Sequence, residues 1–252
     1  MKSTTNIFCI ALLAFVANNC FAQSTDGLFY VFNADWSPAK SFDKCTYFMH
    51  EKKESDTAYM CRYYSKVGPM IKQECYRDSA LSIPSGFFCW YDENGKIDSC
   101  GNVLNFKKDG RWLYFMGDST VPTYYDEYDN GKYVGRKIEA QTLSDTLAKD
   151  TTDKEAIFGN GTKDWMKYTS QHLKVPDRLA TNFKAGTYRV RACFTIDKNG
   201  KITDVYLKKS VEWAADESVF DLLKNAPDWK PAIRKGKPVL YRETQDFVMN
   251  LD

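Results

Sequence analysis

Residues that could carry out covalent or metal chemistry are few in this chain, and their spacing matches no catalytic motif. The 252 residues include only two histidines, His50 and His172, which nearly excludes histidine-based catalysis and histidine-rich metal sites. The sequence has no G-x-S-x-G elbow, no P-loop and no Cys-x-x-Cys pair. We therefore expect a protein that is not an enzyme and that needs no cofactor, metal ion or small-molecule substrate.

The cysteines are the one set of reactive side chains with a suggestive spacing. Six follow the first 22 residues: Cys45, Cys61, Cys75, Cys89, Cys100 and Cys193. Asn94-Gly95 lies between two short alternating runs and predicts a β-hairpin. A two-residue turn there places Cys89 opposite Cys100, close enough for a cross-strand disulfide. A three-residue turn shifts the pairing and removes the contact, so both alternatives stay open.

The N-terminus predicts export. Lys2 supplies a positive charge, Ile7–Val16 forms an apolar run of about ten residues, and Ala22 offers a small residue for cleavage. The run is well short of the ~20 residues of a membrane-spanning helix. We expect residues 1–22 to be a cleaved signal peptide and the mature protein to reside in the periplasm or cell envelope. Retention of the segment as an uncleaved anchor is the alternative.

The charge balance gives no reason to expect a nucleic-acid partner. The chain has 35 basic and 33 acidic residues, a net charge of +2. No basic stripe stands out along the sequence.

Residues 24–132 predict a mainly-β module built from repeated hairpins. Gly86–Tyr91 and Gly110–Phe115 both begin with glycine and continue with aromatic residues, 24 positions apart. Asn-Gly-Lys turns follow each of them. This pattern resembles MORN-type and YwqK-type antitoxin repeats. Residues 133–161 are polar and poor in aromatics, which indicates a linker.

The C-terminal residues 162–252 alternate between helical and strand periodicity. Residues 165–173 and 215–226 have apolar residues at helical spacing, while Tyr188–Ile196 alternates strictly and 201–208 continues it after a turn. A last strand is expected from Val239 to Leu251. The order helix-strand-strand-helix-strand predicts an α+β domain with an antiparallel sheet. Cys193 falls on the polar face of its strand, either unpaired or bridged to the first module or to a second chain.

Four motifs in this region resemble the TonB C-terminal domain, over residues 163–252. They are Leu173–Pro176, Phe194–Val205, Trp229–Ala232 and Gly236–Val239, and the variant resembles those of Bacteroidota. The resemblance implies that the last strand lies at a sheet edge and pairs with an extended peptide. It implies an outer-membrane receptor or another envelope protein as the partner. The edge residues that it suggests are Val239, Tyr241, Glu243, Gln245 and Phe247.

The sequence departs from an energy transducer in its spacer. The chain has eight prolines and no proline-rich run, and a linker of about 29 residues reaches roughly 30 Å. We therefore expect an exported protein that binds an extended peptide by strand addition, with a link to outer-membrane transport. The alternatives are a TonB-family transducer component with an uncleaved anchor, and a structural cell-wall-associated protein without a peptide ligand. A homodimer is also left open.

Overall fold

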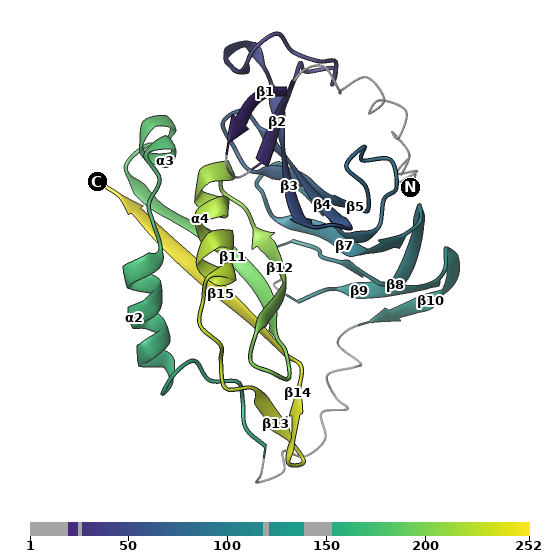
Figure 1. Cartoon of the computed structure of the whole chain (residues 1–252), viewed down its shortest axis with the longest axis vertical. Helices are drawn as coiled ribbons and strands as arrows, with labels where there is room; N and C mark the ends of the chain where they lie inside the picture. The colour runs from purple at the N-terminus through teal and green to yellow at the C-terminus, as the bar shows by residue number, and fades with distance from the viewer. Residues whose placement is uncertain (1–19, 25–26, 118–120, 139–152) are drawn as a thin grey trace.

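Two antiparallel sheets of unequal size form the molecule (Figure 1). The computed structural model describes residues 20–24, 27–117, 121–138 and 153–252. The larger sheet contains ten strands whose spatial order follows the sequence, so that each strand pairs with the next through a hairpin. The smaller sheet has three strands in the order β12-β11-β15, and β13 with β14 forms a separate hairpin.

The elements have the following bounds. The strands of the larger sheet are β1 (Cys20–Ser24), β2 (Gly27–Phe32), β3 (Tyr47–Ser55), β4 (Ala58–Ser65), β5 (Met70–Tyr76), β6 (Gly86–Tyr91), β7 (Ile97–Leu104), β8 (Lys107–Tyr114), β9 (Tyr124–Asp129) and β10 (Lys132–Ile138). The remaining elements are α2 (Thr162–His172), α3 (Asp177–Asn182), β11 (Gly186–Ile196), β12 (Ile202–Lys209), α4 (Trp213–Lys224), β13 (Ala232–Arg234), β14 (Lys237–Val239) and β15 (Tyr241–Leu251).

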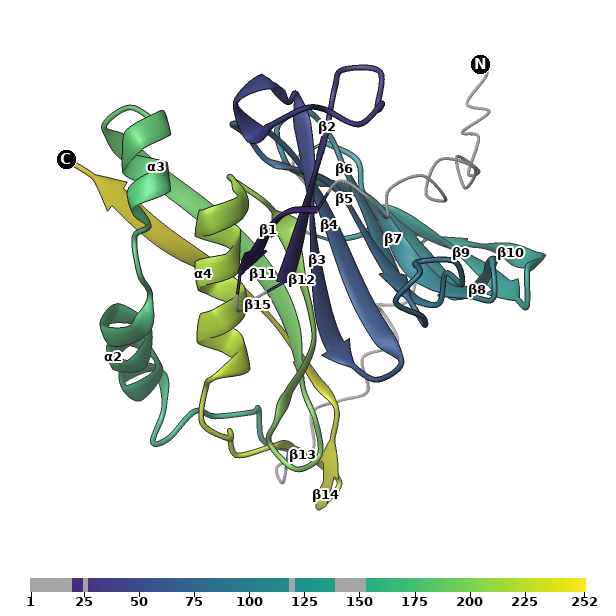
Figure 2. The same cartoon turned by 45° about the horizontal axis from the view of Figure 1, so that its top comes forward.

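The predicted fold class, an α+β domain joined to a separate mainly-β domain, is wrong. The described residues are mostly β-structure, with three α-helices, and the two halves share one hydrophobic core. A single buried cluster contains residues of both sheets and of α4, among them Phe48, Tyr64, Cys100, Cys193, Leu207 and Leu223. Figure 2 shows the helices on one side of the molecule and β5 to β10 on the other.

The reason for this error lies on the second face of β11. Strand alternation assigned Cys193 and Thr195 to the exposed face, but they are 0% and 6% exposed. Cys193 lies in the same buried cluster as Cys89 and Cys100 of the larger sheet. The three-stranded sheet is therefore covered on both faces where it meets its neighbour, and only part of its second face is polar and open.

Backbone and side-chain hydrogen bonds join the two sheets. The Tyr91 hydroxyl donates to the carbonyl of Leu207 at 3.0 Å. The Ser210 N–H donates to the carbonyl of Gly95 at 2.8 Å, and its hydroxyl accepts from the Met70 N–H at 2.7 Å. Because these bonds are buried or shielded, separating the halves would leave polar groups without partners.

A charged cluster fixes α4 against the larger sheet. Glu217 of α4 accepts from Arg62 at 2.7 Å and lies 3.4 Å from Lys52 and 3.7 Å from His50. Arg62 also stacks on Phe220, with its guanidinium carbon 3.8 Å from the ring centroid. Burial opposes ionisation of Glu217, but the facing cations, Arg62 first, lower its pKa to about 2.

Two turns with the same Asp-x-Asn-Gly-Lys sequence position the two sheets. In residues 92–96 and 197–201 the first aspartate accepts from the backbone N–H groups two and four residues later. Gly95 and Gly200 have φ of +75° and +89°, and a Cβ on Gly200 would lie 1.8 Å from the carbonyl oxygen of Trp229. Both glycines therefore allow a left-handed turn and a close approach to a distant segment.

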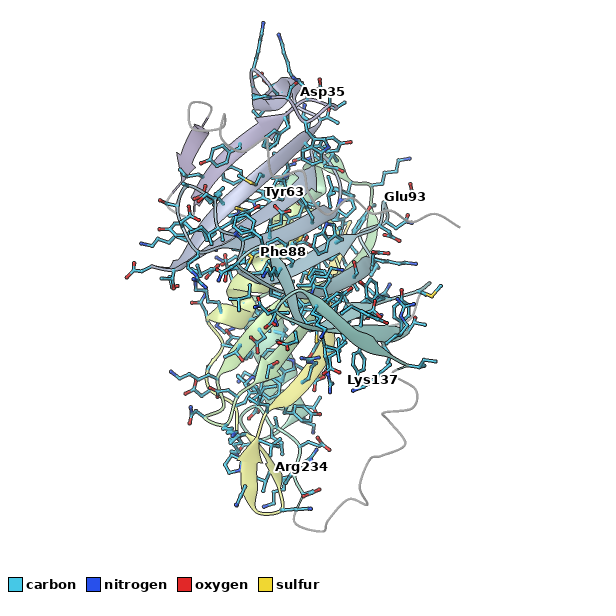
Figure 3. The ribbon with its side chains drawn as sticks, turned by 90° about the vertical axis from the view of Figure 1, so that its right-hand side faces the viewer. Asp35, Tyr63, Phe88, Glu93, Lys137 and Arg234 are labelled. Carbon is cyan, nitrogen blue, oxygen red and sulfur yellow. The ribbon has the colours of Figure 1, made fainter. Side chains whose placement is uncertain are left out.

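The outer face of the larger sheet is rich in aromatic side chains (Figure 3). Tyr63 and Phe88 lie on this face. Trp36 packs against Tyr63 and is stacked on Tyr47, with 4.5 Å between the Trp36 and Tyr47 ring centroids. These contacts agree with a packing role for the aromatic residues of 24–132.

The predicted signal peptide lies mostly outside the described residues. Residues 20–24 form β1, so cleavage after Ala22 would remove most of this strand. Of the predicted linker, residues 133–138 belong to β10 and residues 139–152 lie outside the described part. Lys154 and Ile157 form β-bridges with Ile233 and Lys230.

Candidate functional site

The free edge of β15 is the clearest candidate for a binding site. β15 pairs with β11 along its whole length, from Tyr241 opposite Ile196 to Leu251 opposite Gly186. Within the described residues no strand pairs with its other edge, and no turn or loop backbone hydrogen bond involves it. Roughly half of the backbone groups of an antiparallel edge strand point outward. The strand therefore offers unpaired N–H and C=O groups over eleven residues.

The structure divides the five predicted edge residues into two groups. Val239 ends β14, where it pairs with Ala232, so it is not part of the edge strand. The other four, Tyr241, Glu243, Gln245 and Phe247, lie on β15.

Those four side chains point to the helix-covered face. Their partners on β11 are core residues, and Phe247 is 2% exposed opposite Val190. Gln245 accepts a hydrogen bond of 2.5 Å from the Trp165 indole of α2. These residues therefore anchor the strand beneath the helices rather than facing a guest.

The accessible face of β15 carries the residues of the other parity, which the sequence analysis missed. They are Arg242, Thr244, Asp246, Val248 and Asn250. Arg242, Val248 and Asn250 are exposed. The same two-residue alternation could have identified them, because the apolar Phe247 and Met249 mark which parity is buried.

Cations surround Asp246, the one carboxylate on the accessible face of β15. Arg191 donates to Asp246 through two nitrogens, at 2.5 and 2.8 Å. These hydrogen bonds, helped by the nearby Arg189 and Lys209, lower the pKa of Asp246.

Lys208 of β12 also projects from this face of the sheet. Its ammonium donates to Thr244 at 3.1 Å. Burial, together with the positive charges of Arg242 and Arg191, lowers the pKa of Lys208. The second face of the three-stranded sheet is thus a positively charged surface.

On the helix-covered face, the start of β15 lies beside acidic side chains. Burial, and then the neighbouring Glu243 and Glu155, raise the pKa of Tyr241 to about 12. Burial raises the pKa of Glu243, and Glu155 adds to the effect. The two faces of the edge strand therefore differ in charge.

A cleft of about 540 Å³ between the two sheets is a second candidate. Its walls include Arg62, Phe87, Tyr206 and Phe220, and it extends to Arg242 at the β15 side. The buried Arg62 already contacts Gln73 and Glu217. The cleft has the size of a ligand site, but its buried polar groups bind one another.

The two cysteines of the predicted disulfide face each other across β6 and β7. Cys89 is directly opposite Cys100, as a two-residue turn would give. The turn is in fact longer, with Asp92 N–H bonded to the Lys96 carbonyl, and a register shift after Trp90 restores the pairing. Both thiols are free and buried, and burial raises the pKa of Cys89. The disulfide remains a prediction.

Metal binding and membrane spanning find no structural support in the described part of the chain. No group of three His, Cys, Asp or Glu side chains there could hold a metal ion. No helix there is both long enough and apolar enough to cross a membrane.

No family model, curated protein or solved structure matches this chain. The resemblances to the TonB C-terminal domain and to MORN-type repeats therefore rest on the sequence motifs alone.

Proposed function

We propose that this protein is an exported envelope protein that binds an extended segment of a partner protein at the free edge of β15. The observation that carries the proposal is an eleven-residue strand whose outer edge pairs with nothing in the described chain. Backbone pairing gives such a site its affinity, and neighbouring side chains give it selectivity. An outer-membrane receptor segment is the partner that the sequence motifs suggest.

The rigidity of the edge supports this use. β15 is held by a continuous ladder with β11 and by the Trp165–Gln245 hydrogen bond. Phe247 and Met249 are 2% and 1% exposed, so the strand is fixed in the core. A guest strand therefore meets a preformed template, and the protein loses little conformational entropy on binding.

The position of the edge also favours access. β12, the opposite edge strand, lies toward the larger sheet, with Lys209 bridged to Lys96. β15 lies on the far side of β11 from this contact. The described strands of the first half therefore do not occupy the proposed site.

Hydrogen exchange on the whole mature chain tests the proposal. The probe is a capped nine-residue peptide of alternating threonine and valine. We expect the amides of β15 to become protected on peptide addition while those of β12 do not change. Unchanged exchange in β15 at millimolar peptide would count against peptide binding.

Backbone methylation of the peptide provides the matched control. In an added strand, alternate N–H groups of the guest bond to the host. Methylating one alternate set should abolish protection, whereas methylating the other set should preserve it. Equal effects of both sets would show that the peptide binds without joining the sheet.

A further inference from the structure

The open face next to the proposed site carries an excess of positive charge. Five cations project from the three strands: Arg189, Arg191, Lys208, Lys209 and Arg242. Asp246 is the carboxylate placed among them, and Asp204 lies at the β12 bulge. Arg191 is bound to Asp246, and within the described residues neither Arg189 nor Arg242 forms an ion pair, so positive charge exceeds negative charge along β11 and β15.

The register shows which of these cations a guest strand would meet. A guest paired to β15 places alternate side chains on the open face, about 5 Å from those of β15. Arg242 lies directly beside that position. Arg189 is opposite Val248, and both are exposed, so the long arginine side chain can extend past the short valine toward the guest.

We infer that the guest strand is acidic, with carboxylates on the alternate residues that lie over Arg189 and Arg242. This inference rests on the proposed strand addition and specifies its partner. Opposite charges on neighbouring strands stabilise pairing, and like charges directly opposite destabilise it. A basic guest would add its charge to a surface where Lys208 already lies near two arginines.

Arginine suits this recognition better than lysine would. The guanidinium donates two parallel hydrogen bonds to a carboxylate. This pairing sets the orientation of the carboxylate in addition to attracting its charge. Arg191 already binds Asp246 in this two-nitrogen manner on the same face. Arg189 and Arg242 have the same chemistry available toward a guest.

Three matched peptides on the whole mature chain test the inference. They share the alternating nine-residue frame, with threonine, glutamate or lysine at the polar positions. At low salt we expect the glutamate peptide to bind about tenfold more tightly than the threonine peptide, and the lysine peptide to bind most weakly. The preference should shrink as salt rises to about 0.5 M, because exposed charges are screened.

Charge reversal identifies the residues. Arg189→Glu and Arg242→Glu should each reduce affinity for the glutamate peptide about tenfold and leave the threonine peptide within about twofold. Lys107→Glu, on the exposed start of β8, is the matched control and should change neither. Circular dichroism of each variant checks that the fold is retained.

The outcomes separate the two proposals. Equal affinity for the three peptides, or tighter binding of the lysine peptide, overturns the acidic guest and leaves strand addition standing. Loss of all binding with an intact protein overturns both. Charged side chains can also protect an edge from pairing, and that role would give no binding of any peptide.

Discussion

Among the described residues, most ion pairs between α4 and the larger sheet involve Glu217. It binds Arg62 at 2.7 Å and lies within 4 Å of Lys52 and His50, while only 8% of its surface is exposed. A buried carboxylate with several cations raises stability only while it is ionised. Removing it leaves Arg62 buried without its anionic partner.

The first prediction concerns pH. The folded pKa of Glu217 is about 2, below its ordinary value of 4.5, so its contribution is fully present above pH 4.5. This stability is lost as pH falls through 4.5 toward about 2. Glu217→Gln should cost about 3 kcal/mol at pH 7 and progressively less on acidification. Urea unfolding at pH 7 and pH 3 measures both differences, and a pH-independent cost would contradict the assignment.

The second prediction concerns a buried hydroxyl. Tyr64 is 0% exposed, and its hydroxyl has no hydrogen-bond partner among the described residues. Tyr64→Phe should therefore change the free energy of unfolding by less than about 1 kcal/mol, or raise it. Tyr91→Phe is the matched control, because it leaves the Leu207 carbonyl without its donor and should cost about 1–2 kcal/mol. Equal costs for the two variants would refute this account.

At the scale of elements, two turns with the same sequence motif determine both local hairpins and long-range contacts. The Asp-x-Asn-Gly-Lys turns close hairpins and also contact distant segments, since the Gly200 carbonyl accepts from the Trp229 N–H at 2.7 Å. A glycine at such a position meets two demands, a positive φ and the absence of a Cβ.

The third prediction separates these two demands. Gly200→Ala would place a Cβ 1.8 Å from the Trp229 carbonyl oxygen and should cost more than about 2 kcal/mol. Gly236 also has a positive φ of +72° but has no atom within 4 Å of its ideal Cβ. Gly236→Ala should therefore cost only about 1 kcal/mol. Thermal unfolding of both variants measures the difference, which should vanish if only the turn conformation matters.

Local periodicity located the C-terminal elements well. The expected strand at 188–196 is β11 at 186–196, and the helix expected at 215–226 is α4 at 213–224. The last strand was expected to be continuous from Val239, but the chain breaks at Leu240 into β14 and β15. Val239 pairs instead with Ala232, seven residues earlier, in the local β13–β14 hairpin, which the expected single strand did not include.

For the candidate site on β15, the sequence analysis predicted the strand but not which of its faces is open. Alternation divides the side chains of β15 into two sets, and the TonB resemblance suggested the set that the helices cover. The covering helix α2 contacts β15 through the Trp165–Gln245 hydrogen bond, 80 residues apart in the chain. The apolar Phe247 and Met249 of that set indicate which parity is buried, but which element covers it is decided by long-range packing, which alternation does not contain.

At the scale of the whole molecule, the shared core changes what the C-terminal half can do alone. Cys193 and Tyr206 are nearly fully buried. Cys193 packs beside the larger sheet, and the Tyr206 ring lies 5.1 Å from Phe87 between centroids. A fragment of residues 162–252 would expose these side chains and would leave Glu217 without Arg62 and Lys52.

The fourth prediction follows from that loss. We expect the mature chain to unfold in one cooperative transition, with equal calorimetric and van't Hoff enthalpies, because the two halves stabilise each other. The isolated 162–252 fragment should lack a dispersed amide NMR spectrum and should bind a hydrophobic dye. Adding the separately produced first half should restore a dispersed amide spectrum of the fragment, because the two halves then bury their shared core again. Two separate transitions, or a well-dispersed fragment spectrum, would show instead that the halves are independent domains.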